Sequence, residues 1–249
     1  MQDKPVALVT GANKGIGFQI ARELAARGFT VLLGSRDLEK GDTAAAGVEG
    51  DAHAIQLDVT DEVSVAAAAD RVRREFGRLD VLVNNAGISH AGGPERSFDD
   101  IIAATRMSAV AMDELCTVFE TNVFGVVSVT QAMLPLLREA PDARIVNVSS
   151  GAGSLTLHSR PDNPSRDKFG TYSASKTALN AVTLAFAIDL EDTNIRVNAV
   201  CPGFTKTDLN TFLGTQTVAE GARQPVRLAL LDPGTPTGSF SANSGAMPW

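Results

Sequence analysis

The sequence predicts an α/β fold in which helices cover both faces of a mainly parallel sheet of about seven strands. Two observations lead to this prediction. Short apolar runs alternate with longer amphipathic stretches along the whole chain, and the runs contain few polar residues. Strands without polar alternation are typical of a sheet that is covered on both faces. Regular alternation of strand and helix favours right-handed crossovers, and therefore parallel strands.

The individual elements follow from these patterns. The expected strands are rich in Val, Ile and Leu: Val6–Thr10, Thr30–Gly34, Ala54–Leu57, Val81–Asn84, Arg144–Val148 and Arg196–Val200. The expected helices cover about Gly15–Arg27, Asp61–Phe76, Met112–Arg138 and Tyr172–Leu190. No internal repeat and no linker divides the 249 residues. We therefore expect a single doubly wound domain over residues 1–249.

Three long segments interrupt the alternation: residues 89–107, 151–170 and 204–220. Each follows an expected strand, so each leaves the carboxyl edge of the sheet, where open α/β sheets bind ligands. Loops of this length in a compact domain are usually functional or disordered. We expect these segments to form the substrate site.

Composition excludes several classes of protein. The formal net charge is −7 without a run of like charges, which argues against nucleic acid or an anionic membrane surface as the main partner. No apolar stretch approaches the roughly 20 residues of a membrane span, and the first expected strand begins too early for a signal peptide. Two cysteines and three scattered histidines provide no metal-ligand spacing. We expect a cytoplasmic protein without a metal.

A glycine-rich turn follows the first expected strand and opens the first expected helix. Gly11 permits a sharp turn, Gly15 permits close approach of a pyrophosphate, and Gly17 permits tight packing of helix on strand. The N–H groups and the positive end of the helix dipole would then face the anion. Glycines alone are a weak signal, but this position between strand and helix indicates a dinucleotide site of the Rossmann type.

Basic residues near the end of the second strand favour NADP(H) over NAD(H). Arg36 can pair with a 2′-phosphate through two hydrogen bonds, and Lys14 and Lys40 add positive charge nearby. NAD-specific sites usually have an acidic residue in this region. Asp37 has a simpler role available, as the cap of a following helix.

The chain contains one tyrosine, Tyr172, which stands four residues before Lys176. Residues four apart share one face of a helix, so the phenol and the ammonium can lie close together. A nearby cation favours the phenolate, and this would lower the pKa towards the working range of a general acid or base. The alternative is a partly buried tyrosine and a surface lysine at this spacing by chance.

In this order, the glycine turn, Asn84-Asn85-Ala86-Gly87, Asn122, Ser149-Ser150 and Tyr172-x-x-x-Lys176 resemble the short-chain dehydrogenase/reductase family over almost the whole chain. The nearest branch is similar to the single-domain NADPH-dependent carbonyl reductases. That likeness rests on three strings: Asn13-Lys14-Gly15-Ile16-Gly17, Glu120-Thr121-Asn122-Val123-Phe124-Gly125 and Cys201-Pro202-Gly203.

The resemblance implies roles for four catalytic residues. Tyr172 would donate the proton to a carbonyl oxygen, and Ser150 would hydrogen-bond that oxygen, with Ser149 as the competing candidate. Lys176 would lower the Tyr172 pKa and hold the nicotinamide ribose. Asn122 would kink the long central helix and hold a water that links Lys176 to solvent. Further positions would line the cofactor: Asn13, Ile16, Asp58, Val59, Asn85, Ala86, Gly87, Pro202, Gly203, Thr205 and Thr207.

One departure from the family concerns the spacing between Ser150 and Tyr172, which are 22 residues apart. In the simplest members the two residues are closer together. The inserted residues adjoin the helix through which most relatives pair, so we expect a monomer or homodimer rather than a tetramer. Four residues of the long segments are candidates for the pocket lining: His90, Phe169, Phe204 and Phe212.

Together these features predict an NADPH-dependent enzyme that reduces a ketone or aldehyde to an alcohol. Two alternatives stay open. The first is a dehydrogenase that works in the oxidative direction, and the second is a non-catalytic NADP(H)-binding sensor. The sequence leaves the identity of the small carbonyl substrate undefined.

Overall fold

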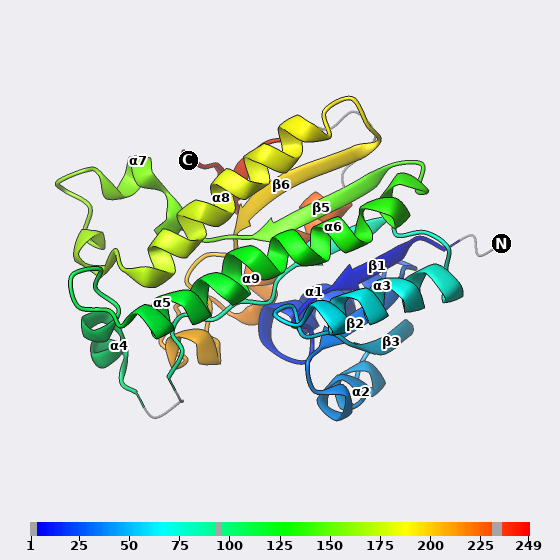
Figure 1. Ribbon diagram of the computed structural model, residues 1–249, viewed down its shortest axis with the longest axis horizontal. Coiled ribbons are helices and arrows are strands. Elements are labelled where there is room, and N and C mark those ends of the chain that lie inside the picture. Colours follow the sequence, from blue (N-terminus) through cyan, green and yellow to red (C-terminus); the bar gives the residue numbers. More distant parts are fainter. Residues whose placement is uncertain (1–3, 93–95, 231–235) are drawn as a thin grey trace.

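The computed structural model of the chain describes residues 4–92, 96–230 and 236–249. Within them, eight strands form one sheet in the order β3-β2-β1-β4-β5-β6-β7-β8 (Figure 1). The first seven pair in parallel, and β8 is antiparallel to β7. The strands are β1 (Val6–Val9), β2 (Thr30–Ser35), β3 (Asp51–Gln56), β4 (Val81–Asn84), β5 (Ala143–Val148), β6 (Ile195–Cys201), β7 (Phe240–Ala242) and β8 (Gly245–Ala246).

Helices cover both faces of this sheet, as the sequence predicts (Figure 1). One face packs against α3 (Glu62–Glu75), α6 (Gly125–Arg138) and α8 (Thr171–Asp189). The other face packs against α1 (Gly15–Ala25), α2 (Leu38–Ala46) and α9 (Val218–Ala229). Every residue of β1, β2, β4 and β5 is buried, which explains why these strands lack polar alternation. The fold is doubly wound: β1 to β3 extend the sheet towards one side, and β4 and the later strands extend it towards the other, so the strand order reverses between β1 and β4.

Among the helices that cover the sheet, α2 and α9 are missing from the sequence prediction. In α2, Asp37 accepts a hydrogen bond from the Lys40 N–H at 3.1 Å, which confirms its predicted role as a cap. In α9, Thr217 and Glu220 form a reciprocal capping box. Gly221 and Pro225 obscure the α9 pattern, because both residues are poor helix formers. The third strand begins at Asp51 rather than Ala54. The sequence prediction omits its first three residues because they are partly or fully exposed and form no apolar run.

The long central helix predicted over Met112–Arg138 is divided into three parts. α5 (Met112–Phe119) leads into a π-helical turn, η1 (Glu120–Phe124), and α6 completes the helix. Such single π turns are rare and frequently occur at functional sites. Asn122 lies inside this turn and is fully buried.

The long segments lie beyond the carboxyl ends of the strands (Figure 1), and each contains short helical elements. Residues 89–107 include α4 (Phe98–Ala104), although 93–95 lie outside the described residues. Residues 151–170 include η2 (Gly151–Gly153), α7 (Leu155–His158) and η3 (Arg166–Lys168), and residues 204–220 include η4 (Asp208–Asn210) and the start of α9. In the part of the chain that is described, no helix is both long and apolar enough to cross a membrane.

The C-terminal stretch returns to the second of these segments. The ring of Trp249 stacks on Phe240 of β7, with centroids 5.4 Å apart. Ser154 Oγ donates to the carbonyl of Pro248 at 2.8 Å, and the Thr156 N–H donates to the carbonyl of Trp249 at 3.0 Å. The last residues therefore support the segment that follows β5.

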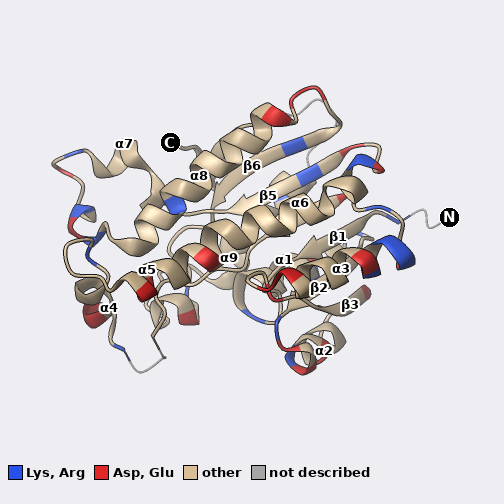
Figure 2. Cartoon of the chain, in the orientation of Figure 1, with Lys and Arg blue, Asp and Glu red and all other residues tan. Residues whose placement is uncertain are grey.

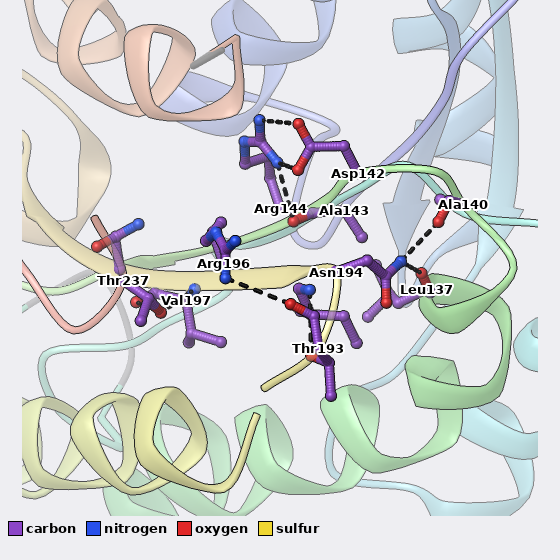
Figure 3. A network of polar contacts seen from close by, with 12 residues as sticks. Leu137, Ala140, Asp142, Ala143, Arg144, Thr193, Asn194, Arg196, Val197 and Thr237 are labelled. Carbon is purple, nitrogen blue, oxygen red and sulfur yellow. Dashed lines mark hydrogen bonds and ion pairs between the residues drawn. The ribbon is translucent and has the colours of Figure 1, made fainter. Parts of the chain in front are cut away.

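The opposite edge of the sheet is held by a polar network at the amino ends of β5 and β6 (Figure 3). The buried Arg144 guanidinium pairs with Asp142 through both of its terminal nitrogens. Asn194 Nδ2 donates to the carbonyls of Leu137 at 3.1 Å and Ala140 at 2.5 Å, which ties the start of β6 to the end of α6. This network is remote from the long segments.

Candidate active site

The glycine-rich turn connects β1 to α1, as the sequence predicts. Gly11 and Gly15 have φ angles of +61° and +59°, a region in which side chains are strained. A Cβ at Gly17 would lie 2.4 Å from Asn85 Nδ2 and 2.6 Å from the Gly11 carbonyl. The α1 helix begins directly at Gly15, so its unpaired N–H groups are available to an anion.

The loop after β4 packs against this turn. Asn85 Nδ2 donates to the carbonyls of Thr10 at 2.9 Å and Gly11 at 3.2 Å. Thr10 Oγ1 in return accepts the N–H groups of Asn85 and Ala86, both at 3.0 Å. A Cβ at Gly11 would lie 3.0 Å from the Ala86 Cα, so small residues are required on both sides. The turn and the loop meet at the β1–β4 switch point, where doubly wound folds bind dinucleotides.

The three cations proposed for the 2′-phosphate differ in their partners. Arg36 is exposed and has no ionic partner among the described residues. Lys40 pairs with Asp37 at 2.9 Å, and this pairing lowers the pKa of the Asp37 carboxyl. Lys14 forms an ion pair with Asp208, which lies 194 residues further along the chain.

Asp58 already has hydrogen-bond partners within its own turn. Its Oδ1 accepts from the N–H of Thr60 at 3.0 Å and from Thr60 Oγ1 at 2.7 Å. The next residue, Val59, contacts the helix at Gly125, where a Cβ would approach Val59 Cγ2 to 2.9 Å. One carboxylate oxygen of Asp58 therefore shapes the turn.

The segment after β6 extends across the glycine turn. Gly203 has a φ of +80°, and a Cβ there would lie 2.5 Å from Gln216 Oε1. Thr205 is buried, and its hydroxyl donates to the Pro202 carbonyl at 3.2 Å. Thr207 is the residue directly before η4, and its methyl would lie 3.6 Å from a Cβ placed on Gly15. This segment and the glycine turn therefore face each other across a short distance.

Tyr172 and Ser150 lie at the carboxyl edge of the sheet. Tyr172 is in the first turn of α8, and Ser150 lies two residues after the end of β5. The Ser150 side chain hydrogen-bonds the buried phenol oxygen, which lowers the Tyr172 pKa, but burial dominates and raises that pKa to about 12. Tyr172 is therefore a protonated hydrogen-bond donor at neutral pH.

Lys176 is buried beside Tyr172, with an exposed fraction of 4%. Its Nζ lies 5.7 Å from the centroid of the Tyr172 ring and donates to the Val148 carbonyl at 2.9 Å. Burial lowers the Lys176 pKa to about 8. The expected lowering of the Tyr172 pKa by Lys176 is not found, because desolvation of the phenol dominates and raises this pKa.

Asn122 connects the central helix to the loop after β4. Its Oδ1 accepts the Ile88 N–H at 2.8 Å, and its Nδ2 donates to the Ile88 carbonyl at 2.8 Å and to Ser175 Oγ at 3.0 Å. A Cβ at Gly87 would lie 3.2 Å from Asn122 Oδ1 and 3.5 Å from Lys176 Nζ. Because Gly87 has no side chain, Asn122 and Lys176 can both approach this position.

The two candidate serines point in different directions. Ser149 is buried, and its Oγ donates to Asn180 Oδ1 at 2.6 Å, which ties β5 to α8. Ser150 Oγ accepts the Ala152 N–H at 3.2 Å and lies next to the Tyr172 hydroxyl. The geometry therefore favours Ser150 for contact with a substrate.

The predicted pocket residues lie in the long segments and have different neighbours there. Phe204 lies 6.4 Å from Phe98 between ring centroids, and Phe169 lies 5.0 Å from His158. Ser89 Oγ lies 2.9 Å from His90 Nδ1, and Phe212 is largely exposed. Phe98 is absent from the sequence prediction because it stands in a segment without clear periodicity.

Sequence reasoning also missed several residues that shape the site, namely Thr10, Ser175, Asn180 and Asp208. The first three act through hydrogen bonds to neighbouring elements, and no local pattern marks such contacts. Asp208 has a weak signal, because it follows the predicted cofactor residue Thr207 directly.

A family model described as short chain dehydrogenase matches residues 5–217. The chain belongs to the short-chain dehydrogenase/reductase family. It is 36% identical to short-chain dehydrogenase/reductase 1 of Saponaria officinalis, over 100% of this chain and 97% of that protein. It is 33% identical to carbonyl reductase [NADPH] 1 of Mus musculus, over 99% of both.

Among solved structures, salutaridine reductase from Papaver somniferum aligns with a TM-score of 0.80 and 31% identity. The alignment covers 95% of this chain and 99% of that chain. As a short-chain dehydrogenase/reductase, the protein is an oxidoreductase that uses a nicotinamide dinucleotide. The glycine cradle at the β1–β4 switch point fits that group, because side chains at Gly11 or Gly17 would fill it.

Proposed function

We propose that the protein reduces a ketone or aldehyde to an alcohol, with NADPH as the hydride donor and Tyr172 as the general acid. The single observation that carries this proposal is the position of a protonated, half-buried phenol that is hydrogen-bonded to Ser150 and lies close to Lys176, at the carboxyl edge of the sheet, where the glycine turn also lies. In this family fold, a dinucleotide on the turn would extend towards these side chains.

Each of these side chains has a defined task in the proposed reaction. NADPH, when bound, supplies the hydride. Tyr172, whose pKa is raised to about 12 by burial, would give its proton to the carbonyl oxygen as negative charge develops there. Ser150 Oγ would donate a second hydrogen bond to that oxygen. Donors that are already fixed in a water-poor site stabilise such charge strongly.

Lys176 and Asn122 would support the proton transfer. Loss of the proton leaves a phenolate in a buried site, and a cation 5.7 Å from the ring centroid stabilises that anion. Asn122 holds the Ile88 backbone and Ser175 Oγ, and Ser175 Oγ donates to the Tyr172 carbonyl at 2.7 Å. Asn122 therefore positions the first turn of α8.

The preference for NADPH rests on the basic residues at the end of β2. Arg36 is exposed without a carboxylate partner among the described residues, so its guanidinium is available to a phosphate. Relatives whose names include reductase support the reductive direction. They include (-)-isopiperitenone reductase of Mentha piperita, 36% identical over 97% of both chains, and the NADPH carbonyl reductase of mouse.

The proposal is tested by removing one hydroxyl with Tyr172→Phe. Loss of the general acid should lower kcat for a panel of quinones, diketones and polycyclic ketones by about 100- to 10,000-fold, while NADPH affinity remains close to that of the wild type. NADPH consumption and a fluorescence titration measure the two quantities. Turnover at the wild-type rate would falsify the mechanism.

A matched serine pair provides the control. Ser150→Ala should lose most of the turnover, since it removes the second donor to the carbonyl oxygen. Ser149→Ala should instead lower the stability by about 1 kcal/mol through the lost bond to Asn180, and should retain turnover. The reverse result would assign the catalytic role to Ser149.

A further inference from the structure

Lys14 is linked to a distant part of the chain by its ion pair with Asp208. Lys14 precedes the first residue of α1 in the glycine turn, and Asp208 begins η4 in the segment after β6. The side chains are 65% and 50% exposed, so the pair contributes little to stability. Its main effect is to place a carboxylate next to a cation of the proposed cofactor site.

The position of Asp208 is fixed by its neighbours. Asn210 is buried, and its Nδ2 donates to the Thr205 carbonyl at 2.8 Å. The Leu209 carbonyl accepts Ser89 Oγ at 2.9 Å, which joins this turn to the loop after β4. The turn ends with Thr211 in a left-handed conformation, at φ +51°, which is unusual for a β-branched residue. Asp208 is therefore presented on a well-tethered turn, although its side chain is half exposed.

The three cations near the proposed 2′-phosphate site differ in where their carboxylate partners come from. Arg36 has no carboxylate partner in the described ranges. The partner of Lys40 is Asp37, the cap of the same helix, so that pair is local. Only for Lys14, among these three, does the neutralising carboxylate come from the segment that faces the glycine turn across the cofactor site.

We propose that Asp208 is a specificity-determining residue whose carboxylate competes with the 2′-phosphate of NADP(H) for the Lys14 ammonium. This inference rests on the proposed NADP(H) preference and deepens it. The segment after β6 then influences which dinucleotide binds, as well as forming a wall of the site. A phosphate and a carboxylate require the same donors of an ammonium, so removal of the carboxylate charge releases Lys14 for the phosphate.

The experiment compares Asp208→Asn, which keeps the shape and removes the charge, with wild type. Dissociation constants for NADPH and NADH are measured by nucleotide fluorescence in low salt. Asp208→Asn should bind NADPH about threefold more tightly, the size of effect expected for an exposed charge pair, and should bind NADH as wild type does. The gain should fade in about 0.5 M salt, because exposed charges are then screened.

Three further variants make the result specific. In a Lys14→Met background, Asp208→Asn should change neither constant. Asp208→Ser should reproduce the gain, which guards against an effect of the asparagine side chain itself. Asp192→Asn is the matched charge control, because Asp192 is exposed in the turn before β6 at the opposite edge of the sheet. It should leave both constants unchanged.

Other results overturn the inference. Equal tightening of NADPH and NADH would mean that Lys14 serves the shared pyrophosphate, and weaker or unchanged NADPH binding would mean that Asp208 only anchors its turn. The proposed function fails separately. If the wild-type protein binds NADH more tightly than NADPH, the NADP(H) assignment is wrong. The competition is still tested in that case, because the ratio of the NADPH and NADH dissociation constants can be compared between Asp208→Asn and wild type.

Discussion

Lys176 places an ionisable amine in a nearly water-free position, where burial lowers its pKa to about 8. The unfolded chain holds this proton up to about pH 10, so folding releases a proton between pH 8 and 10. The free energy of unfolding of the wild type must therefore rise with pH in this window, and the buried charge is destabilising below it.

The matching variant is Lys176→Met, which cannot titrate. Between pH 7 and 10, the unfolding free energy of cofactor-free wild type should rise by about 1–3 kcal/mol relative to that of the variant. Urea denaturation at each pH measures the difference. If the difference in unfolding free energy between wild type and variant stays constant with pH, Lys176 has an ordinary pKa in the folded protein. Lys176→Met should also lose turnover.

Arg36 provides a test of cofactor preference at a single side chain. A charge-assisted pair with a phosphate contributes about 1.5–3 kcal/mol, so Arg36→Ala should weaken NADPH binding by roughly 10- to 100-fold and leave NADH binding almost unchanged. Arg74→Ala, an exposed arginine on α3, is the control. Equal loss for both nucleotides would remove Arg36 from the 2′-phosphate site.

Single residues also mark the limit of sequence reasoning. The Tyr172–Lys176 spacing was sufficient to predict that the two side chains lie together, because helix geometry fixes that relation. The direction of the Tyr172 pKa was not predictable, since it depends on burial by distant segments. The Lys14–Asp208 pair was equally hidden, because 194 residues separate its members.

At the scale of elements, the amino ends of β5 and β6 depend on the network in Figure 3. Asn194→Ala removes both bonds to the carbonyls at the end of α6. We expect a loss of about 1–3 kcal/mol in unfolding free energy with kcat unchanged, measured by urea denaturation and steady-state assay. Glu191→Ala is the control, because Glu191 is exposed in the same turn; it should change neither the unfolding free energy nor kcat. A fall in kcat for Asn194→Ala would instead connect the amino ends of β5 and β6 to the candidate site.

The elements that the sequence predicted well are the buried strands and the helices with a continuous apolar stripe. The π turn of η1 was hidden, because the apolar pattern continues on both sides of it. β7 and β8 were also hidden, because strands of three and two residues are too short for any periodicity to appear.

At the scale of the molecule, the state of association stays a prediction. α6 and α8 are almost free of charge (Figure 2), and Leu184 and Ile188 of α8 are exposed. We expect a monomer or homodimer by light scattering after size exclusion, because residues 151–170 extend next to the amino end of α8. Ile188→Glu should convert any dimer to a monomer by placing a charge on this apolar surface; a tetramer would contradict the expectation.

The contacts of Pro248 and Trp249 have a practical consequence for experiments. Both carbonyls accept hydrogen bonds from residues just beyond Ser150, and the indole stacks on the last parallel strand. An affinity tag fused after Trp249 would thus begin next to the segment that follows Ser150, and we expect it to alter the kinetics. Purification handles belong before β1, because the amino end of β1 points away from the end marked C (Figure 1).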